Sequence, residues 1–213
     1  MRVGKGASVA DFVIHEKMIR RSSEFSNKAL SGSWREAQDQ VVHLPEYWAT
    51  DFDIYHRWLL EGRLYSQTPD PSGPMVALMS ELLVLQPLSD LGHFLQDTDF
   101  LDTISDAILQ CAKELKAMYG CIPINYGSDF FKFTPESSRI RVLVADLVVW
   151  TETKDVFKDL KQEDNHPDFV MALLNAMASK FQSDGSAMSP LDSRKSNAST
   201  TAMGSRSSAT GQL

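Results

Sequence analysis

Apolar residues recur at helical spacing over most of the chain, and strand-like patterns are confined to its beginning. Short apolar runs predict strands at 11–15 and 41–44, and Pro45 closes the second. Between them, the apolar spacing predicts two short helices that break around Ser22 and Ser23. We expect Ser23 to cap the second helix, because a serine oxygen accepts a hydrogen bond from a free backbone N–H.

The next pattern predicts an amphipathic helix over 50–60. Thr50 and Asp53 resemble a capping box at its start, and Gly62 supplies a stop. One face of this helix is aromatic and aliphatic, and we expect it to lie in the core. That face consists of Phe52, Tyr55, Trp58 and Leu59.

Two longer helical patterns follow. Residues 76–95 are apolar at helical spacing, and Pro87 is expected to kink or divide this helix. Thr98 or Asp99 is expected to cap the next helix, which Gly120 ends. Its apolar residues follow steps of three and four and are Phe100, Ile104, Ile108, Cys111, Leu115 and Met118.

The last part of the chain is less regular. The pattern predicts irregular or extended structure over 122–133, a helix from Pro135 to Leu147 and a last helix that opens at Pro167. Residues 183–213 hold nine serines and no aromatic residue, which predicts a disordered tail. Together the patterns predict a mostly helical α+β fold with a short mixed sheet. No internal repeat indicates a solenoid or a propeller.

Composition and charge narrow the function classes. Apolar residues make up 43% of the chain and charged residues 23%, as in soluble globular domains. The net charge is -7, and the tail over 183–213 contributes +1, so residues 1–182 carry -8. An acidic domain of this kind argues against direct nucleic-acid binding and against docking on an anionic membrane. Two cysteines, no secretory signal and no apolar run near the ~20 residues of a membrane span predict a cytoplasmic or nuclear protein.

Histidines are the candidates for chemistry, but none falls into a catalytic or metal-binding pattern. The sequence places no nucleophile or carboxylate beside His15, so a hydrogen-bonded structural histidine is expected. His43 and Glu46 are three residues apart, but Pro45 lies between them at a strand exit, which argues against a metal pair. We therefore expect no enzyme, no cofactor and no metal. The rival interpretation is a small hydrolase or metal enzyme built around His15 or His43.

A set of residues occurs in a recognisable order along the first half of the chain. It consists of Phe12, His15, Ser23, Phe25, Leu44, Trp58, Leu59, Gly62, Leu91, Gly92, Leu95 and Phe100. In this order and spacing the chain resembles a BTB (POZ) domain of the fungal stand-alone type. The resemblance covers about residues 1–115 and departs from the family in three places. Only 2–4 remain of the first strand, which is expected to be truncated; Glu16 stands where a basic residue is common; and Pro87 interrupts a helix.

The resemblance implies a helical cluster flanked by a short sheet that homodimerises, binds other proteins or presents a surface to a cullin-type ubiquitin-ligase scaffold. The candidate surface that it implies consists of Asp53, His56, Arg57, Glu61, Asp97, Asp99 and Asp102. The acidic residues from Asp97 onward are also explained by capping and by a solvated helix face.

These expectations combine into one hypothesis. Residues 1–118 form a BTB/POZ-like domain, 119–182 a helical extension and 183–213 the tail. The chain is expected to be a protein-interaction module, either a homodimer or an adaptor for a cullin-type ligase, with 122–182 as the part able to recruit a target. A transcriptional or scaffold regulator that acts through a partner is the alternative.

Overall fold

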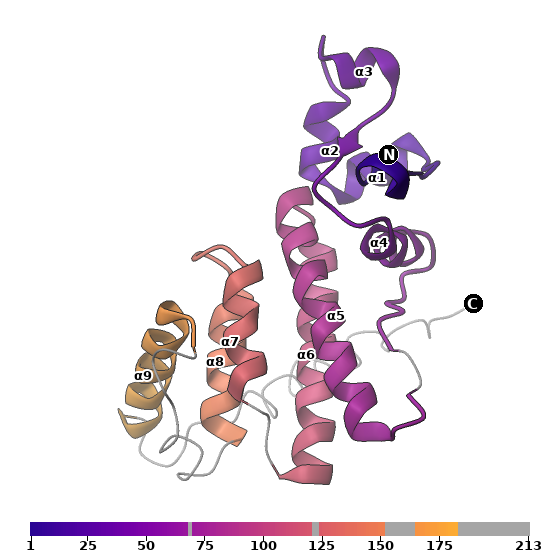
Figure 1. The fold of residues 1–213 in the computed structure, drawn as a ribbon. Coiled ribbons are helices and arrows are strands. Elements are labelled where there is room, and N and C mark those ends of the chain that lie inside the picture. The colour runs from indigo at the N-terminus through magenta and orange to yellow at the C-terminus, as the bar shows by residue number, and fades with distance from the viewer. Residues whose placement is uncertain (68–69, 121–123, 152–164, 183–213) are drawn as a thin grey trace, which may run out of the picture.

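The computed structural model describes residues 1–67, 70–120, 124–151 and 165–182, so the tail prediction for 183–213 and Cys121 lie outside the described residues. Figure 1 shows an α/β head that contains the N-terminus, a central hairpin of two long helices, and three helices that pack beside the hairpin. The elements are β1 Arg2–Val3, a 3₁₀ turn Gly6–Ser8, β2 Ala10–Asp11, α1 Glu16–Ser22, α2 Glu24–Ala29, α3 Arg35–Asp39, β3 His43–Leu44, α4 Ala49–Glu61, α5 Pro74–Leu95, α6 Thr98–Tyr119, α7 Ile124–Phe133, α8 Arg139–Thr151 and α9 Pro167–Gln182. The expected α+β fold, mostly helical with a small mixed sheet, is confirmed.

The sheet has β1 at its centre. β1 pairs antiparallel with β2 and parallel with β3, so that Arg2 lies opposite both Asp11 and His43. The predicted strand over 11–15 is wrong beyond Asp11, because the chain leaves the sheet there and Val13 is 94% exposed. The strand predicted over 41–44 is shorter than expected and holds only the residues of β3.

The break between α1 and α2 is confirmed at Ser23. Its hydroxyl accepts a hydrogen bond from the Ser26 amide at 3.0 Å, which is the expected cap. The same hydroxyl donates to the Leu95 carbonyl at 2.7 Å, at the end of α5. One buried serine therefore both starts α2 and joins the head to the central hairpin.

Two of the predicted caps are wrong by a few residues. α4 begins after Trp48 and no side chain caps it, so Thr50 and Asp53 form no capping box. α6 is capped by Asp97, whose carboxylate accepts from the Phe100 amide at 3.0 Å, instead of by Thr98 or Asp99. Both predicted helix ends are confirmed: Gly62 and Gly120 adopt the left-handed conformation, with φ of 68° and 80°, which a glycine tolerates without steric cost.

α5 runs through Pro87 as one helix, so the proline does not divide it. The helix is the centre of the molecule: eleven of its residues are buried against neighbouring elements. Among the described helices it is also the one long and apolar enough to cross a membrane by length and composition. Burial on this scale is typical of the core helix of a globular domain, which passes the same test.

The irregular or extended structure predicted over 122–133 is wrong for 124–133, where α7 lies, and residues 122 and 123 lie outside the described residues. Phe130 and Phe131 are buried, and Gly127 lies one turn before them on the same side of the helix. A β-carbon at Gly127 would lie 2.9 Å from the Phe169 ring, so the glycine permits close packing on α9. Tertiary packing thus outweighs the weak helix propensity of this segment.

The predicted helix starting at Pro135 begins later, at Arg139, because Pro135 forms a turn that its carbonyl closes with the Ser138 amide. The helix opening at Pro167 is confirmed. Arg141 is buried where α7, α8 and α9 meet, and donates to the carbonyls of Phe131 and Thr134 and to the Asp168 carboxylate. This buried guanidinium holds the three helices together.

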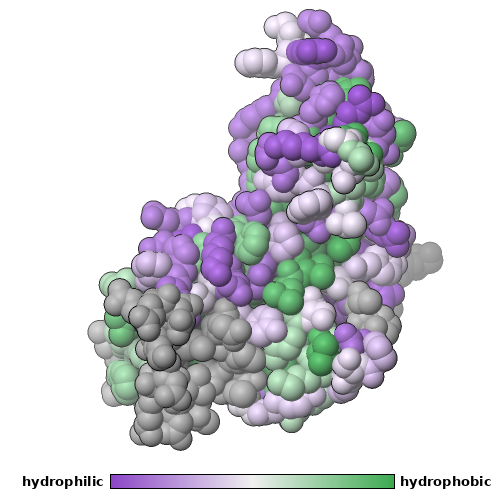
Figure 2. Space-filling model, viewed as in Figure 1, coloured by the Kyte–Doolittle hydropathy of each residue, from purple (hydrophilic) through white to green (hydrophobic). Residues whose placement is uncertain are grey.

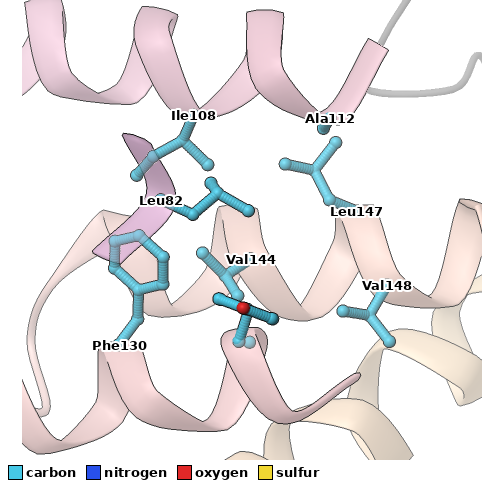
Figure 3. A pocket seen from close by; sticks show the side chains of 9 residues that line it. Leu82, Ile108, Ala112, Phe130, Val144, Leu147 and Val148 are labelled. Carbon is cyan, nitrogen blue, oxygen red and sulfur yellow. The ribbon is translucent and has the colours of Figure 1, made fainter. Parts of the chain in front are cut away.

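The apolar core is continuous from the hairpin into the C-terminal helices. Figure 3 shows side chains from four helices turned toward one another around a small cavity of about 20 Å³. Leu82 comes from α5, Ile108 and Ala112 from α6, Phe130 from α7, and Val144, Leu147 and Val148 from α8. The cavity is almost wholly apolar, so it offers a water molecule too few polar partners and carries no ligand site.

Candidate functional site

The candidate surface lies where α1, α4 and the start of α6 meet, at the end of the hairpin that carries the head (Figure 1). On α4, Asp53 and Arg57 form an exposed ion pair at 2.9 Å, at the i, i+4 spacing of a helix face. Glu61, at the end of α4, accepts a hydrogen bond from the Tyr65 hydroxyl. These charges satisfy one another at the surface and remain accessible to a partner.

His56 differs from its neighbours on α4 because it is half-buried. Its ring packs edge-on against Phe12 at 5.6 Å between centroids. Its Nε2 atom is buried and has no hydrogen-bond partner among the described residues. We conclude that His56 belongs partly to the contact between α4 and the segment after β2, and only partly to the predicted surface.

Asp97 was expected on the candidate surface, but this prediction is wrong because the residue is buried, with 0% of its surface exposed. Its carboxylate accepts hydrogen bonds from the Ser22 hydroxyl, from the Tyr55 hydroxyl at 2.9 Å and from the Phe100 amide at 3.0 Å. Burial raises the pKa of Asp97, and the three donors act in the opposite direction. Asp97 therefore joins α1, α4 and α6 from inside.

Asp99 and Asp102 are exposed, one and two turns into α6. Beside them the Trp58 indole donates to the Thr103 hydroxyl at 3.1 Å, which fixes α4 against α6. The predicted surface thus consists of the outer face of α4 and the first turns of α6, built over a buried layer of Tyr55, Trp58 and Asp97.

A groove of about 550 Å³ runs between α1, the end of α4 and the start of α6. We call it the α1–α4–α6 groove. Its lining is His15, Lys17, Met18, Arg21, Ser22, Leu59 and Asp99. Cationic side chains predominate over the single acid, in a chain whose net charge is -7.

The structure brings no catalytic or metal-binding group together around the predicted histidines. His15 is exposed at the rim of the groove, where its carbonyl accepts the first hydrogen bonds of α1. His43 is exposed on β3. Over the part of the chain that the structure describes, no three His, Cys, Asp or Glu residues lie close enough to hold a metal ion.

The chain has no match among protein-family models and none among curated proteins. The resemblance to BTB domains therefore stays a prediction, and the functional argument rests on the geometry of this chain.

Sequence reasoning missed the second feature of the surface, an apolar stripe on α5. Val76, Leu83, Pro87 and Phe94 follow helical spacing along one face, and Leu83 is 49% exposed. Figure 2 shows hydrophobic atoms gathered over the central hairpin on this side of the molecule. The sequence contained a signal for this stripe, because α5 has apolar residues on nearly all of its faces. A helix in a hairpin buries only part of its surface, so some of these residues must be exposed.

The α5 stripe ends in an aromatic cluster that belongs to the head. The Phe94 ring lies 4.6 Å from that of Phe25 and 5.1 Å from that of Tyr47, between centroids. Trp48, next to this cluster in sequence, is 67% exposed, and Trp34 is 69% exposed. Exposed aromatic residues of this size are enriched at protein–protein interfaces.

A second groove of about 570 Å³ lies between the 63–67 segment, α5 and α6. Glu81 is buried in its wall and accepts hydrogen bonds from the Ser66 hydroxyl at 2.7 Å and the Cys111 thiol at 3.1 Å. Burial raises the pKa of the Cys111 thiol, which keeps it protonated and unreactive.

Proposed function

We propose that the chain is a protein-interaction module of BTB/POZ type, which acts in the cytoplasm or nucleus by self-association or by binding a partner protein. The α5 stripe carries this proposal. It leaves Val76, Leu83 and Phe94 between 40% and 49% exposed along one helix face, although the chain has a large core in which to bury apolar residues. Exposed apolar side chains grouped on one face are typical of a surface that a partner covers.

The order of residues in the head supports the same proposal. The BTB-like positions Leu44, Trp58, Leu91, Gly92, Leu95 and Phe100 are all buried in one cluster. They account for the stability of the head and leave its exposed side chains for recognition. The binding chemistry is burial of apolar and aromatic surface, with the charged pairs of α4 at the rim.

The test is a comparison of two charge insertions on exposed apolar positions. Leu83→Glu places a carboxylate in the α5 stripe, whereas Met171→Glu places one on α9, at a residue of similar exposure. We expect Leu83→Glu to shift the mass measured by light scattering toward the monomer, or to abolish capture of the partner that the wild-type chain retains. Met171→Glu should change neither. A wild-type chain that stays monomeric at high concentration and captures no partner contradicts the proposal.

A narrower form of the proposal makes the chain an adaptor for a cullin-type ligase, with the outer face of α4 as the docking surface. Asp53 and Glu61 are the exposed acids on this face that a scaffold would contact. We expect the double reversal Asp53→Lys, Glu61→Lys to weaken binding to a purified cullin scaffold by at least about tenfold, which corresponds to about 1.4 kcal/mol. Binding that is absent in wild type, or equal in the double variant, excludes the adaptor role and leaves self-association in place.

A further inference from the structure

Two cations in the α1–α4–α6 groove are left without a partner. Lys17 and Arg21 both line the groove, and their side chains have no ion pair and no hydrogen bond among the described residues. They are four residues apart, so they lie on the same face of α1, where like charges destabilise a helix by a few tenths of a kcal/mol. No ion pair among the described residues offsets the cost of these two like charges.

Other cations of the head contrast with this pair. On the same helix, Arg20 binds Glu16 at 2.7 Å, and Lys28 binds Glu24 at 2.7 Å on α2. Arg57 on α4 binds Asp53. In a chain with net charge -7, acids are abundant, yet Lys17 and Arg21 line a groove whose one acid, Asp99, forms no ion pair with either of them.

The groove also has an apolar floor. Met18 and Leu59 supply half-buried apolar surface between the polar side chains. Asp99 is the one acid in the lining, so an anion should bind toward Lys17 and Arg21 and away from Asp99.

We infer that the α1–α4–α6 groove binds an acidic segment of a partner polypeptide, in which carboxylates three or four residues apart meet Lys17 and Arg21. An apolar side chain between them packs on Met18 and Leu59. A polypeptide fits better than a nucleic acid, because a phosphate backbone needs a longer run of cations than these two. The inference rests on the proposed function and names the chemistry of a partner for one groove of the head.

The test measures binding of a labelled acidic peptide to the full chain by fluorescence anisotropy at about 0.15 M salt, where distant charges are largely screened. The peptide has twelve residues with Glu and Leu at helical spacing, and a second peptide carries Gln in place of every Glu. The double variant Lys17→Glu, Arg21→Glu should lower the affinity for the acidic peptide about tenfold or more, because two attractive contacts become repulsive. The Gln peptide should bind weakly to wild type and be insensitive to the double variant.

The matched control reverses Lys113→Glu and Arg139→Glu, two cations that form no ion pair among the described residues. It changes the net charge by the same amount and should leave the affinity unchanged. Asp99→Asn should strengthen binding a few-fold, because it removes the acid that faces the ligand. Tighter peptide binding by Asp99→Asn cannot be explained by partial unfolding of the variant. Circular dichroism of each variant checks that α1 remains helical.

The outcomes separate this inference from the proposed function. Equal binding of both peptides, no effect of the Lys17 and Arg21 reversals, or tighter binding of a twelve-nucleotide oligonucleotide overturns the acidic-segment inference. Leu83→Glu reports on the proposed function and should leave peptide binding unchanged. If the chain self-associates but does not bind the acidic peptide, only the groove inference is contradicted. If the chain is monomeric and binds the peptide, only self-association through the α5 stripe is contradicted.

Discussion

At the scale of single residues, Asp97 controls how the head joins the hairpin. Asp97→Ala removes the cap of α6 and leaves two buried hydroxyls, those of Ser22 and Tyr55, without their acceptor. We expect a loss of about 2–4 kcal/mol in the free energy of unfolding, the sum of a lost cap and unsatisfied buried donors. Urea denaturation measures it. Asp99→Ala, exposed in the first turn of α6, should cost less than about 1 kcal/mol; equal losses in both variants contradict the assignment.

The same carboxylate should make stability depend on pH. Burial raises the pKa of Asp97 above its ordinary value of 3.8, so the folded state binds this proton more tightly than the unfolded state. The stability that comes from its protonation is fully present below about pH 3.8 and is lost as pH rises through the raised pKa. We expect the unfolding free energy of wild type, measured relative to Asp97→Asn, to fall across that range. Burial also raises the pKa values of Asp51, Asp90 and Asp146. Both proteins contain these residues, so their contributions cancel when the unfolding free energy of Asp97→Asn is subtracted from that of wild type. A constant difference from pH 3.5 to 7 would exclude the shift.

At the scale of elements, α5 contains Pro87 in its interior, where a proline costs the helix one backbone hydrogen bond. Pro87 has no N–H for the Leu83 carbonyl, yet α5 continues through it because packing on both sides holds the helix. We therefore expect Pro87→Ala to stabilise the protein by about 1–3 kcal/mol. Pro74→Ala is the matched control, since proline is favoured at the first helical position and its removal should change stability by less than about 0.5 kcal/mol. Thermal unfolding of both variants measures these changes. A Pro87→Ala protein that is less stable than wild type contradicts the claim that Pro87 destabilises α5.

The elements also show which signals in a sequence are reliable. Ser23, Gly62, Gly120 and Pro167 act locally, through one hydroxyl, one backbone conformation or one missing donor, and each was predicted correctly. α7 was missed because its helix depends on packing of Phe130 and Phe131 against helices far away in the chain. The predicted cap of α6 was wrong by one or two residues, since Asp97, Thr98 and Asp99 are all good caps and only the partners of Asp97 in other elements select it.

At the scale of the whole molecule, the candidate surface shows the same limit. The resemblance implies Asp53, Arg57 and Glu61 as surface residues, and they are accessible on the outer face of α4. The burial of Asp97 could not be predicted, because it depends on Ser22 and Tyr55, which come from other elements. The pairing of charges could not be predicted either: Arg20 pairs with Glu16, whereas Lys17 and Arg21 on the same helix form no ion pair among the described residues.

The continuity of the core decides whether the BTB-like part, residues 1–118, can exist alone. Leu82, Ile108 and Ala112 on the hairpin are buried by α7 and α8, so a chain ending at Gly120 exposes them to water. We expect the 1–120 fragment to unfold without a cooperative transition and to bind a hydrophobic dye, whereas a 1–182 chain should keep the unfolding free energy of the full chain within about 0.5 kcal/mol. Chemical denaturation and dye fluorescence measure both. A cooperative 1–120 fragment would show that α7–α9 are an accessory to the head, whereas its collapse makes them part of one folding unit on which the α5 stripe depends.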